Sequence, residues 1–239
     1  MSNVEKLQKM IDESSNIVFF GGAGVSTESG IKDFRGKNGL YNEKNDTGHS
    51  PEYLLSIDCL LREPKLFFDY YRKNLNYSDI KPNVTHLYLK KLEDSGKLKA
   101  IVTQNIDGLH QLAGSKNVLE VHGNATRCYC MKCHKEYTGD AILKSDDIPK
   151  CSCGGIIRPD VTLYGEMLPE AFDIAGKYIR EADMLIVAGT SLTVYPAAGL
   201  VRLFRGKHLV IINENVTPLD YIAELVINKK LGEVFGKLK

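Results

Sequence analysis

Two polar segments, each directly after a short apolar run, carry the residues best suited to chemistry in this chain. Residues 103–107 (TQNID) follow Ala100-Ile101-Val102, and His122-Gly123 follows a run that ends at Val121. The carboxyl ends of strands form the ligand-binding edge of an open α/β sheet, so we expect both segments at that edge. Two amides, a carboxylate and an imidazole could hold a polar cofactor beside a base. A lone histidine is more often structural, so the interpretation depends on what else reaches this edge.

A glycine-rich turn follows the first predicted strand. Residues 19–26 (FFGGAGVS) pass from apolar residues into glycines, and Ser26 or Thr27 could cap a following helix. Glycines let the backbone approach a pyrophosphate, and a helix N-terminus favours the anion. The third glycine of the dinucleotide fingerprint is missing, because Thr27 stands at its place. Taken alone, the turn fits a nucleotide site and a plain strand–helix turn equally well.

Two later predicted strands also end in residues suited to a nucleotide. Residues 184–188 lead into Gly-Thr-Ser (189–191), whose small side chains and hydroxyls can line a phosphate or a ribose. Residues 209–212 lead into Asn-Glu-Asn (213–215), which could bind ribose hydroxyls. Because ligand-type residues follow five successive strands, we favour a dinucleotide bound across the crevice of the sheet.

Four cysteines have the spacing of a metal site. Two residues separate Cys130 from Cys133, and after seventeen more residues Cys151 and Cys153 form a second pair with one residue between them. Two close thiolate pairs are typical of a closed tetrahedral zinc site that stabilises a small module. A catalytic zinc would keep an open position and usually bind a histidine or a carboxylate, so this site is predicted to be structural.

Three other residues bear on this prediction. Cys128 and His134 lie close enough in sequence to compete as ligands, and free thiols remain the alternative to zinc. Cys59 is interpreted as a small core residue.

Composition narrows the class of protein. Lys and Arg total 31 and Asp and Glu total 30, so the net charge of +1 gives no field that would recruit nucleic acid or an anionic membrane. The first residues lack the basic start and apolar core of a signal peptide, and no apolar run approaches the ~18 residues of a membrane helix. We therefore expect a soluble, cytoplasmic protein in a reducing compartment, where clustered cysteines bind metal.

The hydrophobic pattern predicts an α/β fold with a doubly wound parallel sheet. Short apolar runs alternate with helical patterns, which is typical of strands covered on both faces. The predicted strands are residues 16–20, 99–103, 118–121, 184–188, 209–213 and 225–228. The predicted helices between them are residues 84–95, 170–182 and 196–204.

Two stretches interrupt this alternation. Residues 33–80 are irregular and aromatic-rich, with a helix expected over 64–75. Residues 125–160 hold the four cysteines of the predicted metal site and also Cys128. We expect them to form a cofactor-binding loop with a helical part, and a zinc-binding module. The Rossmann-like domain would then comprise residues 1–32, 81–124 and 161–239.

Seven motifs in a fixed order resemble the sirtuins, the NAD-dependent protein-lysine deacylases. The resemblance extends from about residue 17 to residue 231, and the seven motifs together are far more specific than any one of them. They are GAGVS (22–26), GIKDFR (30–35), TQNID (103–107), HG (122–123), the two cysteine pairs, YGE (164–166) and GTS (189–191). The resemblance implies a Rossmann-type domain, with a zinc ribbon and a helical segment in a smaller lobe.

The resemblance also implies roles for individual residues. His122 would be the general base, and the NAD co-substrate would be held by a larger set from several strand ends. That set is Gly22, Ala23, Gly24, Thr27, Asp33, Phe34, Arg35, Gln104, Asn105, Ile106, Asp107, Gly189, Thr190, Ser191, Asn213, Glu214, Lys230 and Leu231. The implied peptide-binding residues are Val161, Tyr164, Gly165, Glu166, Val194 and Tyr195.

In the reaction implied, the carbonyl oxygen of an acyl-lysine attacks the nicotinamide ribose and nicotinamide leaves. The base then activates a ribose hydroxyl, which attacks the resulting alkylimidate, and water completes the hydrolysis. The products are free lysine, nicotinamide and O-acyl-ADP-ribose. An imidazole that titrates near neutrality suits this role. The substrate would add as an extended strand between residues 161–166 and the loop 192–196. Core packing is the alternative for Tyr164 and, more strongly, for Tyr195.

Departures from the sirtuin pattern are few. Lys32 stands for the usual proline, and Asp160 and Thr162 replace the commoner Asn and apolar residue. Members that prefer succinyl-lysine carry a Tyr-x-x-Arg pair, at positions that an ungapped count matches to Phe68 and Tyr71 here. We therefore expect activity on acetyl and other uncharged acyl groups.

Two alternatives remain open. The same scaffold could act as a mono-ADP-ribosyltransferase, or as a non-catalytic NAD-sensing module whose zinc ribbon binds a partner. His122 and the intact zinc module argue against the transferase, and His122 and residues 104–107 argue against the non-catalytic module. Nicotinamide release that depends on an acylated peptide separates the three.

Overall fold

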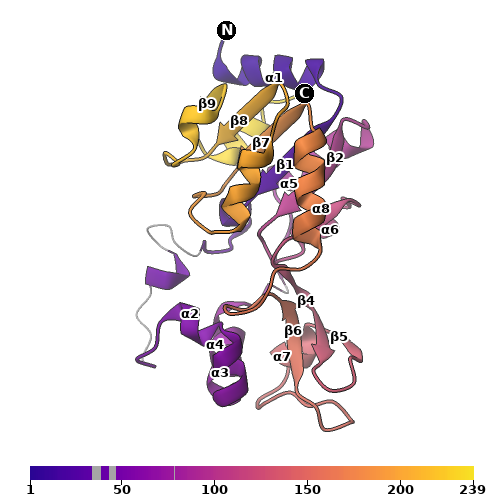
Figure 1. Ribbon diagram of the computed structural model, residues 1–239, viewed down its shortest axis with the longest axis vertical. Coiled ribbons are helices and arrows are strands. Elements are labelled where there is room, and N and C mark those ends of the chain that lie inside the picture. The colour runs from indigo at the N-terminus through magenta and orange to yellow at the C-terminus, as the bar shows by residue number, and fades with distance from the viewer. Residues whose placement is uncertain (34–38, 43–46, 78) are drawn as a thin grey trace.

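A six-stranded parallel sheet forms the larger part of the molecule (Figure 1). The computed structural model describes residues 1–33, 39–42, 47–77 and 79–239. The sheet has the order β3-β2-β1-β7-β8-β9, and every pairing in it is parallel. The strands are β1 Ile17–Gly21, β2 Leu98–Thr103, β3 Val118–Glu120, β7 Met184–Ala188, β8 His208–Ile212 and β9 Leu225–Ile227. In chain order this is 3-2-1-4-5-6, the Rossmann order, which confirms the predicted doubly wound sheet.

Helices cover both faces of this sheet. Helices α1 (Asn3–Glu13), α5 (Val84–Asp94) and α9 (Leu231–Phe235) pack on one face, where Phe19 and Ile186 point. Helix α8 (Ala171–Glu181) and the 3₁₀ helix η4 (Ala197–Leu203) pack on the other face. Alternate residues of each strand therefore enter two separate cores, which accounts for the nearly continuous apolar runs in the sequence.

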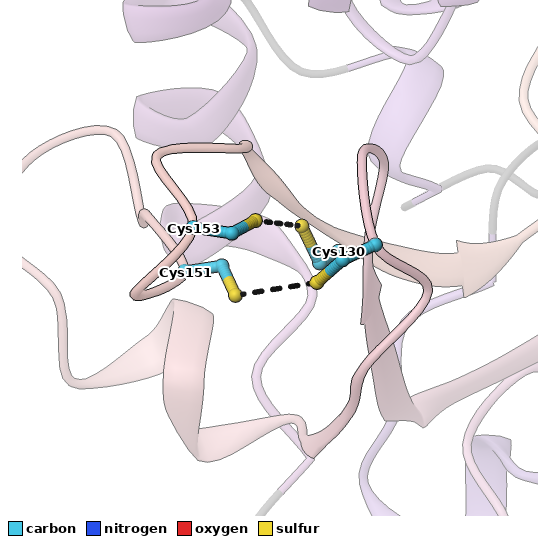
Figure 2. A group of neighbouring side chains, drawn as sticks. Cys130, Cys151 and Cys153 are labelled. Carbon is cyan, nitrogen blue, oxygen red and sulfur yellow. Dashed lines mark hydrogen bonds between the residues drawn. The ribbon is translucent and has the colours of Figure 1, made fainter.

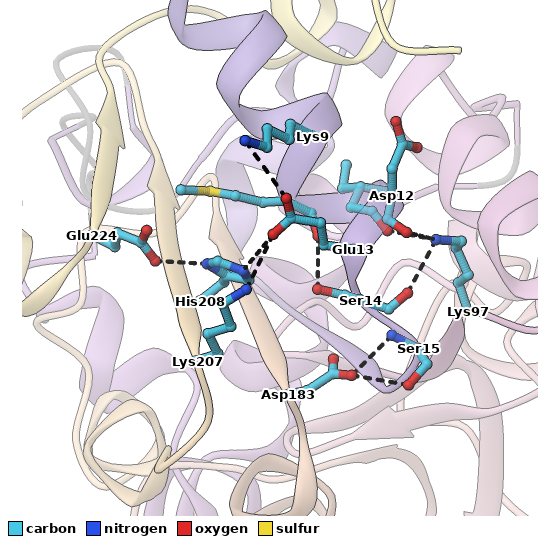
Figure 3. Close-up of polar contacts among 12 residues, drawn as sticks. Lys9, Asp12, Glu13, Ser14, Ser15, Lys97, Asp183, Lys207, His208 and Glu224 are labelled. Carbon is cyan, nitrogen blue, oxygen red and sulfur yellow. Dashed lines mark hydrogen bonds and ion pairs between the residues drawn. The ribbon is translucent and has the colours of Figure 1, made fainter.

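Charged and polar side chains hold α1 at the amino ends of the strands (Figure 3). The ammonium of Lys97 donates to the carbonyls of Ile11, Asp12 and Ser14 at 2.7, 2.8 and 3.1 Å, and so satisfies the last turn of the helix. His208 lies 2.7 Å from Glu224, on the sheet side of the same network. This edge is opposite to the carboxyl ends of the strands, so its charges belong to the scaffold.

A second, smaller part joins two distant segments of the chain (Figure 1). Its elements are α2 Pro51–Leu54, α3 Ile57–Arg62, α4 Pro64–Asn74, β4 Gly123–Cys130, β5 Glu136–Thr138, α7 Asp140–Leu143 and β6 Ile157–Val161. The strands form an antiparallel sheet in the order β5-β4-β6. Phe67 and Tyr71 of α4 share one buried cluster with Cys128 and Ile157 of this sheet. The helical segment and the cysteine-rich segment therefore stabilise each other.

The structure corrects one expectation about the glycine turn. No α-helix follows β1: two 3₁₀ helices, η1 (Ala23–Val25) and η2 (Thr27–Ser29), take its place. Ser26 stands at the N-cap position of η2, but its hydroxyl makes no capping bond and donates to Asp107, while the Thr27 hydroxyl donates to the Gly24 carbonyl. Gly30, at φ +95°, ends the second turn in the left-handed region. We call residues 23–29 the cofactor turn.

Three short elements were not predicted from the sequence. Helix α6 (Leu109–Leu112) follows β2, and the short 3₁₀ helices are η3 (Leu40–Asn42) and η5 (Asp220–Ile222). The helix predicted at 196–204 is present as the 3₁₀ helix η4. Within the described ranges, none of the helices has the length and apolar character needed to cross a bilayer.

Candidate functional site

The site lies where the order of the strands reverses, between β1 and β7. The loops after these strands meet at two glycines, where the Gly24 N–H donates to the Gly189 carbonyl at 2.8 Å. A Cβ atom on Gly24 would lie 2.8 Å from the Gly189 Cα, and one on Gly189 would lie 2.5 Å from the Val25 nitrogen. Gly189 also has φ +59°, in the region that favours glycine. Both positions thus need glycine for backbone contact between the two loops.

Gln104 connects three strand ends across the same crevice. Its backbone N–H donates to the Gly21 carbonyl at 3.0 Å, and its side-chain amide donates to the Thr190 hydroxyl at 3.1 Å. The Thr190 hydroxyl in turn accepts from the Leu192 N–H at 3.3 Å. The predicted residues from the ends of β1, β2 and β7 therefore lie together, as expected for a dinucleotide site.

Ser26, Asn105 and Asp107 form a buried polar cluster beneath the cofactor turn. The Ser26 hydroxyl donates to an Asp107 carboxylate oxygen at 2.7 Å and accepts from the Asn105 amide at 3.0 Å. The other Asp107 oxygen accepts from the Leu109 N–H at 2.9 Å. Asp107 is only 7% exposed, and burial raises its pKa above the usual value. The sequence of residues 103–107 predicted Asn105 and Asp107 as site residues, whereas Ser26 was predicted only as a helix cap.

His122 lies at the edge of this crevice and is held by Gln104. Its Nδ1 is 3.1 Å from the Gln104 carbonyl oxygen, which can only accept. This contact assigns the proton of the neutral ring to Nδ1 and the lone pair to Nε2. The His122 carbonyl accepts from the Thr162 N–H at 2.9 Å, and β4 begins at the next residue. The residue that follows β2 thus holds the imidazole, and the segment after β6 holds the backbone of His122.

Four residues of the predicted NAD set lie after β8 and β9, the strands farthest from β1 on this side of the sheet. Asn213 follows β8, and its amide donates to the Asn215 carbonyl at 2.7 Å, while Glu214 is exposed. Lys230 immediately precedes α9, and Leu231 is buried at its start.

The predicted loop residues Asp33, Phe34 and Arg35 are only partly described. The Asp33 carbonyl accepts from the Leu40 N–H at 2.8 Å, but the predictions for Phe34 and Arg35 lie outside the described residues.

The predicted peptide segment after β6 is only partly extended. Tyr164 bridges to the helical part, accepting from the Ile57 N–H at 3.0 Å and donating its own N–H to the Leu55 carbonyl at 3.1 Å. Gly165 then turns the chain with φ +91°. Tyr164 and Tyr195 are 38% and 63% exposed, so core packing of Tyr195 is wrong, because its ring lies on the surface.

Glu166 has a structural partner that the sequence analysis missed. Arg158 is 4% exposed and forms a two-pronged ion pair with Glu166, whose Oε2 accepts from it at 2.8 Å. The same oxygen accepts from the Leu163 N–H at 2.8 Å. An open cavity of about 430 Å³ is lined by this pair together with Gly123 and Thr162, beside His122. An arginine between Ile157 and Pro159 was the available signal.

The four predicted cysteines come together in the smaller part (Figure 2). The Cys130 and Cys153 sulfurs are 3.5 Å apart, those of Cys133 and Cys151 are 3.6 Å apart, and all four lie within 4.8 Å of one another. Tetrahedral zinc with Zn–S bonds of about 2.3 Å needs sulfurs roughly 3.8 Å apart, so the cluster fits zinc closely. The Tyr137 hydroxyl donates to the Cys151 sulfur at 3.0 Å, an outer contact of the kind that stabilises bound thiolates.

The competing ligands do not join this cluster. Among the described residues, neither Cys128 nor His134 belongs to it. Cys128 is buried in the shared apolar cluster, and burial raises the pKa of its thiol to about 12. Cys59 is fully buried in the same core, as predicted. The four sulfurs leave no histidine or carboxylate ligand, which agrees with a closed structural site.

The fold and the site define a nucleotide-binding Rossmann domain joined to a small four-cysteine metal module. The Sir2 family model matches residues 22–196, and the chain belongs to the Sir2 family. Among the curated relatives, the NAD-dependent protein deacetylase of Clostridium perfringens is 56% identical, with 98% of each chain covered. That of Clostridium acetobutylicum is 53% identical over 98% of this chain and 97% of the relative.

Solved structures agree with this assignment. A Sir2 complex with p53 peptide and NAD⁺ is 40% identical, with a TM-score of 0.86 over 99% of this chain and 97% of that one. A Sir2 complex with an inhibitor, 2'-O-acetyl-ADP-ribose and deacetylated p53 peptide is 38% identical, with a TM-score of 0.84 over 98% and 96%. The whole chain, and not only the sheet, therefore has the sirtuin architecture.

Proposed function

We propose that this chain is an NAD-dependent protein-lysine deacetylase in which His122 is the general base. It transfers the acyl group of an acyl-lysine to ADP-ribose, releases nicotinamide and consumes one NAD per lysine. The observation that carries the assignment of the base is the 3.1 Å contact between His122 Nδ1 and the Gln104 carbonyl at the strand crossover. It directs the basic nitrogen of a neutral imidazole away from β2, as a base for a ribose hydroxyl requires.

We assign NAD to the crevice between the cofactor turn and the loop after β7. The contact between Gly24 and Gly189 supports this assignment, because it leaves backbone rather than side chains facing the diphosphate. Gln104 and Thr190 would hold the ribose and phosphate side, and Asn213, Glu214, Lys230 and Leu231 the adenosine half. Phe34 and Arg35 would cover the nicotinamide ribose.

We assign the nicotinamide amide to the cluster of Asn105, Ile106 and Asp107. A buried carboxylate and an amide side by side can accept from and donate to a carboxamide, which matches its hydrogen-bonding groups. The raised pKa of Asp107 supports a functional role, because perturbed carboxyl groups concentrate at active sites.

The acyl-lysine peptide is assigned to the surface between residues 161–166 and the loop that contains Val194 and Tyr195. Backbone pairing would give affinity with little demand on sequence. The exposed rings of Tyr164 and Tyr195 support this assignment. Glu166 contributes indirectly, since its carboxylate is occupied by Arg158 and Leu163.

Zinc held by Cys130, Cys133, Cys151 and Cys153 supplies structure to the smaller part and no chemistry. We propose a division into a Rossmann-like domain (1–32, 81–124, 161–239), a loop and helical segment (33–80) and a zinc module (125–160). We also propose a cytoplasmic location, and the finding that none of the six cysteines forms a disulfide supports it.

The test is an assay with NAD and a panel of acylated peptides. The proposed reaction gives one nicotinamide, one free lysine and one O-acyl-ADP-ribose per turnover, and it stops without an acylated peptide. Label transferred from NAD to protein would instead indicate ADP-ribosyl transfer. Saturable NAD binding without nicotinamide release would indicate a non-catalytic module.

A further inference from the structure

The cofactor turn depends on contacts from outside for its shape. It consists of two three-residue 3₁₀ helices, and isolated turns this short have little stability of their own. Yet it carries Ala23 and Thr27, which we assign to NAD, and the hydroxyl of Ser26 that binds Asn105 and Asp107. The group that fixes this turn therefore influences the whole NAD site.

Asn83 makes that contact from the start of α5. Its side-chain amide nitrogen donates to the Val25 carbonyl at 2.8 Å and to the Ser29 hydroxyl at 3.0 Å. One amide thus binds the last residue of η1 and the last residue of η2. The span of 54 to 58 residues between the partners makes this a tertiary contact that no local propensity supplies.

The other groups of Asn83 are fixed by its own helix. Its side-chain oxygen accepts from the Thr85 N–H at 3.0 Å, so it is also the N-cap of α5. Its backbone N–H donates to His86 Nδ1 at 3.3 Å. His86 is fully buried and lies against the ring of His110, with centroids 4.7 Å apart. The amide is therefore oriented by a rigid, buried support.

We propose that Asn83 is a positioning residue for NAD binding, which acts by holding the cofactor turn in its binding conformation. The inference rests on the proposed assignment of NAD to this turn. A second contact also holds the turn, because the Glu28 carboxylate accepts from the N–H of Gly232 in α9 at 2.6 Å. Loss of the Asn83 contact should therefore weaken NAD binding without abolishing it.

Asn83→Asp separates this role from helix capping. Aspartate caps helices as well as asparagine does, so α5 keeps its N-cap. The new carboxylate can still accept from Ser29, but it faces the Val25 carbonyl oxygen without a proton to donate. We expect the Kd for NAD, measured by calorimetry on the zinc-loaded protein, to rise about tenfold, the scale of one lost hydrogen bond with an unsatisfied partner. The KM for the acetylated peptide should change less than twofold, and Tm should stay within a few degrees.

Two further variants provide the comparison. Ser29→Ala removes the longer of the two hydrogen bonds that the Asn83 amide donates, and it should raise the Kd for NAD by about twofold. The Ser2 hydroxyl caps α1 by accepting from the Glu5 N–H at 3.3 Å. Ser2→Ala should therefore lower Tm with no change in the affinity for NAD.

The outcomes distinguish this inference from the proposed function. An unchanged Kd for NAD in Asn83→Asp would overturn the inference, and so would equal losses of NAD and peptide affinity together with a large fall in Tm. A wild-type protein that fails to bind NAD would instead contradict the proposed function.

Discussion

The hydroxyl of Ser26 and a carboxylate oxygen of Asp107 lie 2.7 Å apart in the interior, although 81 residues separate them in the chain. The contact connects the cofactor turn to the loop that follows β2. It also holds a carboxylate in a buried place where its charged form is disfavoured, as the raised pKa of Asp107 indicates. A scaffold would gain stability from a neutral residue there, so the cost of this charge points to a binding function.

Replacing His122 with Ala should abolish most deacylation. Loss of a general base typically lowers a rate by about 10²–10⁴-fold. NAD binding should largely persist, since its assigned contacts come from other strand ends. Steady-state turnover on an acetylated peptide and calorimetric NAD binding check these two outcomes separately.

The His122 result needs a control for folding. Zinc content and far-UV circular dichroism of His122→Ala should match those of the wild type. Wild-type turnover in such a folded variant would show that another group acts as the base.

The purified protein should contain one zinc per chain. Cys130→Ala or Cys151→Ala should lose the metal, unfold the module locally and weaken activity, because metal binding and folding of such modules are coupled. Cys128→Ala should keep the metal, since Cys128 lies outside the sulfur cluster. Elemental analysis of the three variants decides the ligand set; zinc lost from Cys128→Ala would contradict it.

The enzyme should prefer acetyl-lysine to succinyl-lysine. Phe68 and Tyr71 are buried at the positions that correspond to the carboxylate-binding pair, and neither is a cation. Arg72 is directed elsewhere, donating to the Asp69 carboxylate at 2.7 Å and to the Asp147 carbonyl at 3.0 Å. A succinyl carboxylate buried without a partner costs several kcal/mol, so kcat/KM should be on the order of a hundredfold lower.

This preference is measured on acetylated and succinylated versions of one peptide. Arg72→Ala should leave the ratio of the two kcat/KM values unchanged. Equal efficiency on both peptides would show that a cation reaches the acyl group after all.

The stability of the protein should fall as the solution is acidified below pH 6.5. Burial lowers the pKa of His86 to about 4, and burial together with His86 lowers that of His110 to about 3. Between these values and 6.5 the unfolded chain binds protons that the native state does not, so stability present above pH 6.5 is lost as the pH falls. Each histidine contributes a slope of up to about 1.4 kcal/mol per pH unit.

His110→Phe should flatten this dependence. Urea unfolding at several pH values gives the slope for the variant and the wild type. Phe19→Leu is the matched control, because Phe19 packs edge-on against His110 at 6.2 Å and does not titrate. It should lower stability at every pH and keep the slope; an unchanged slope in His110→Phe would mean that other groups dominate.

The sequence was a good guide wherever one residue type has one dominant use. Buried parallel strands need unbroken apolar runs, so all six strands of the larger sheet were predicted within about two residues of their observed ends. Four thiols in two close pairs have few roles besides metal binding, and they meet as expected.

The failures concern tertiary contacts that local patterns do not encode. Ser26 was predicted as a helix cap, but its hydroxyl donates to Asp107, which lies 81 positions away in the loop after β2. The sequence predicted Glu166 as a peptide contact but gave no sign of the partners of its carboxylate, Arg158 and the Leu163 N–H. Core packing, the alternative to a peptide contact for Tyr195, is excluded only by its exposure in the structure. In each case the missing information is a distant partner or an orientation that periodicity leaves undetermined.

The strand that ends at Cys130, one of the four cysteines of the metal cluster, begins immediately after His122. Strand β4 starts at Gly123, pairs with β6 at Val161, and reaches Cys130 at its other end. A compound that extracts zinc would therefore disturb the base through the backbone and register as an inhibitor in an activity screen. Its inhibition would grow with time, would not be relieved by excess NAD or peptide, and would be reversed by added zinc. Hits from such a screen should be sorted on these three criteria before they are read as ligands of the active site.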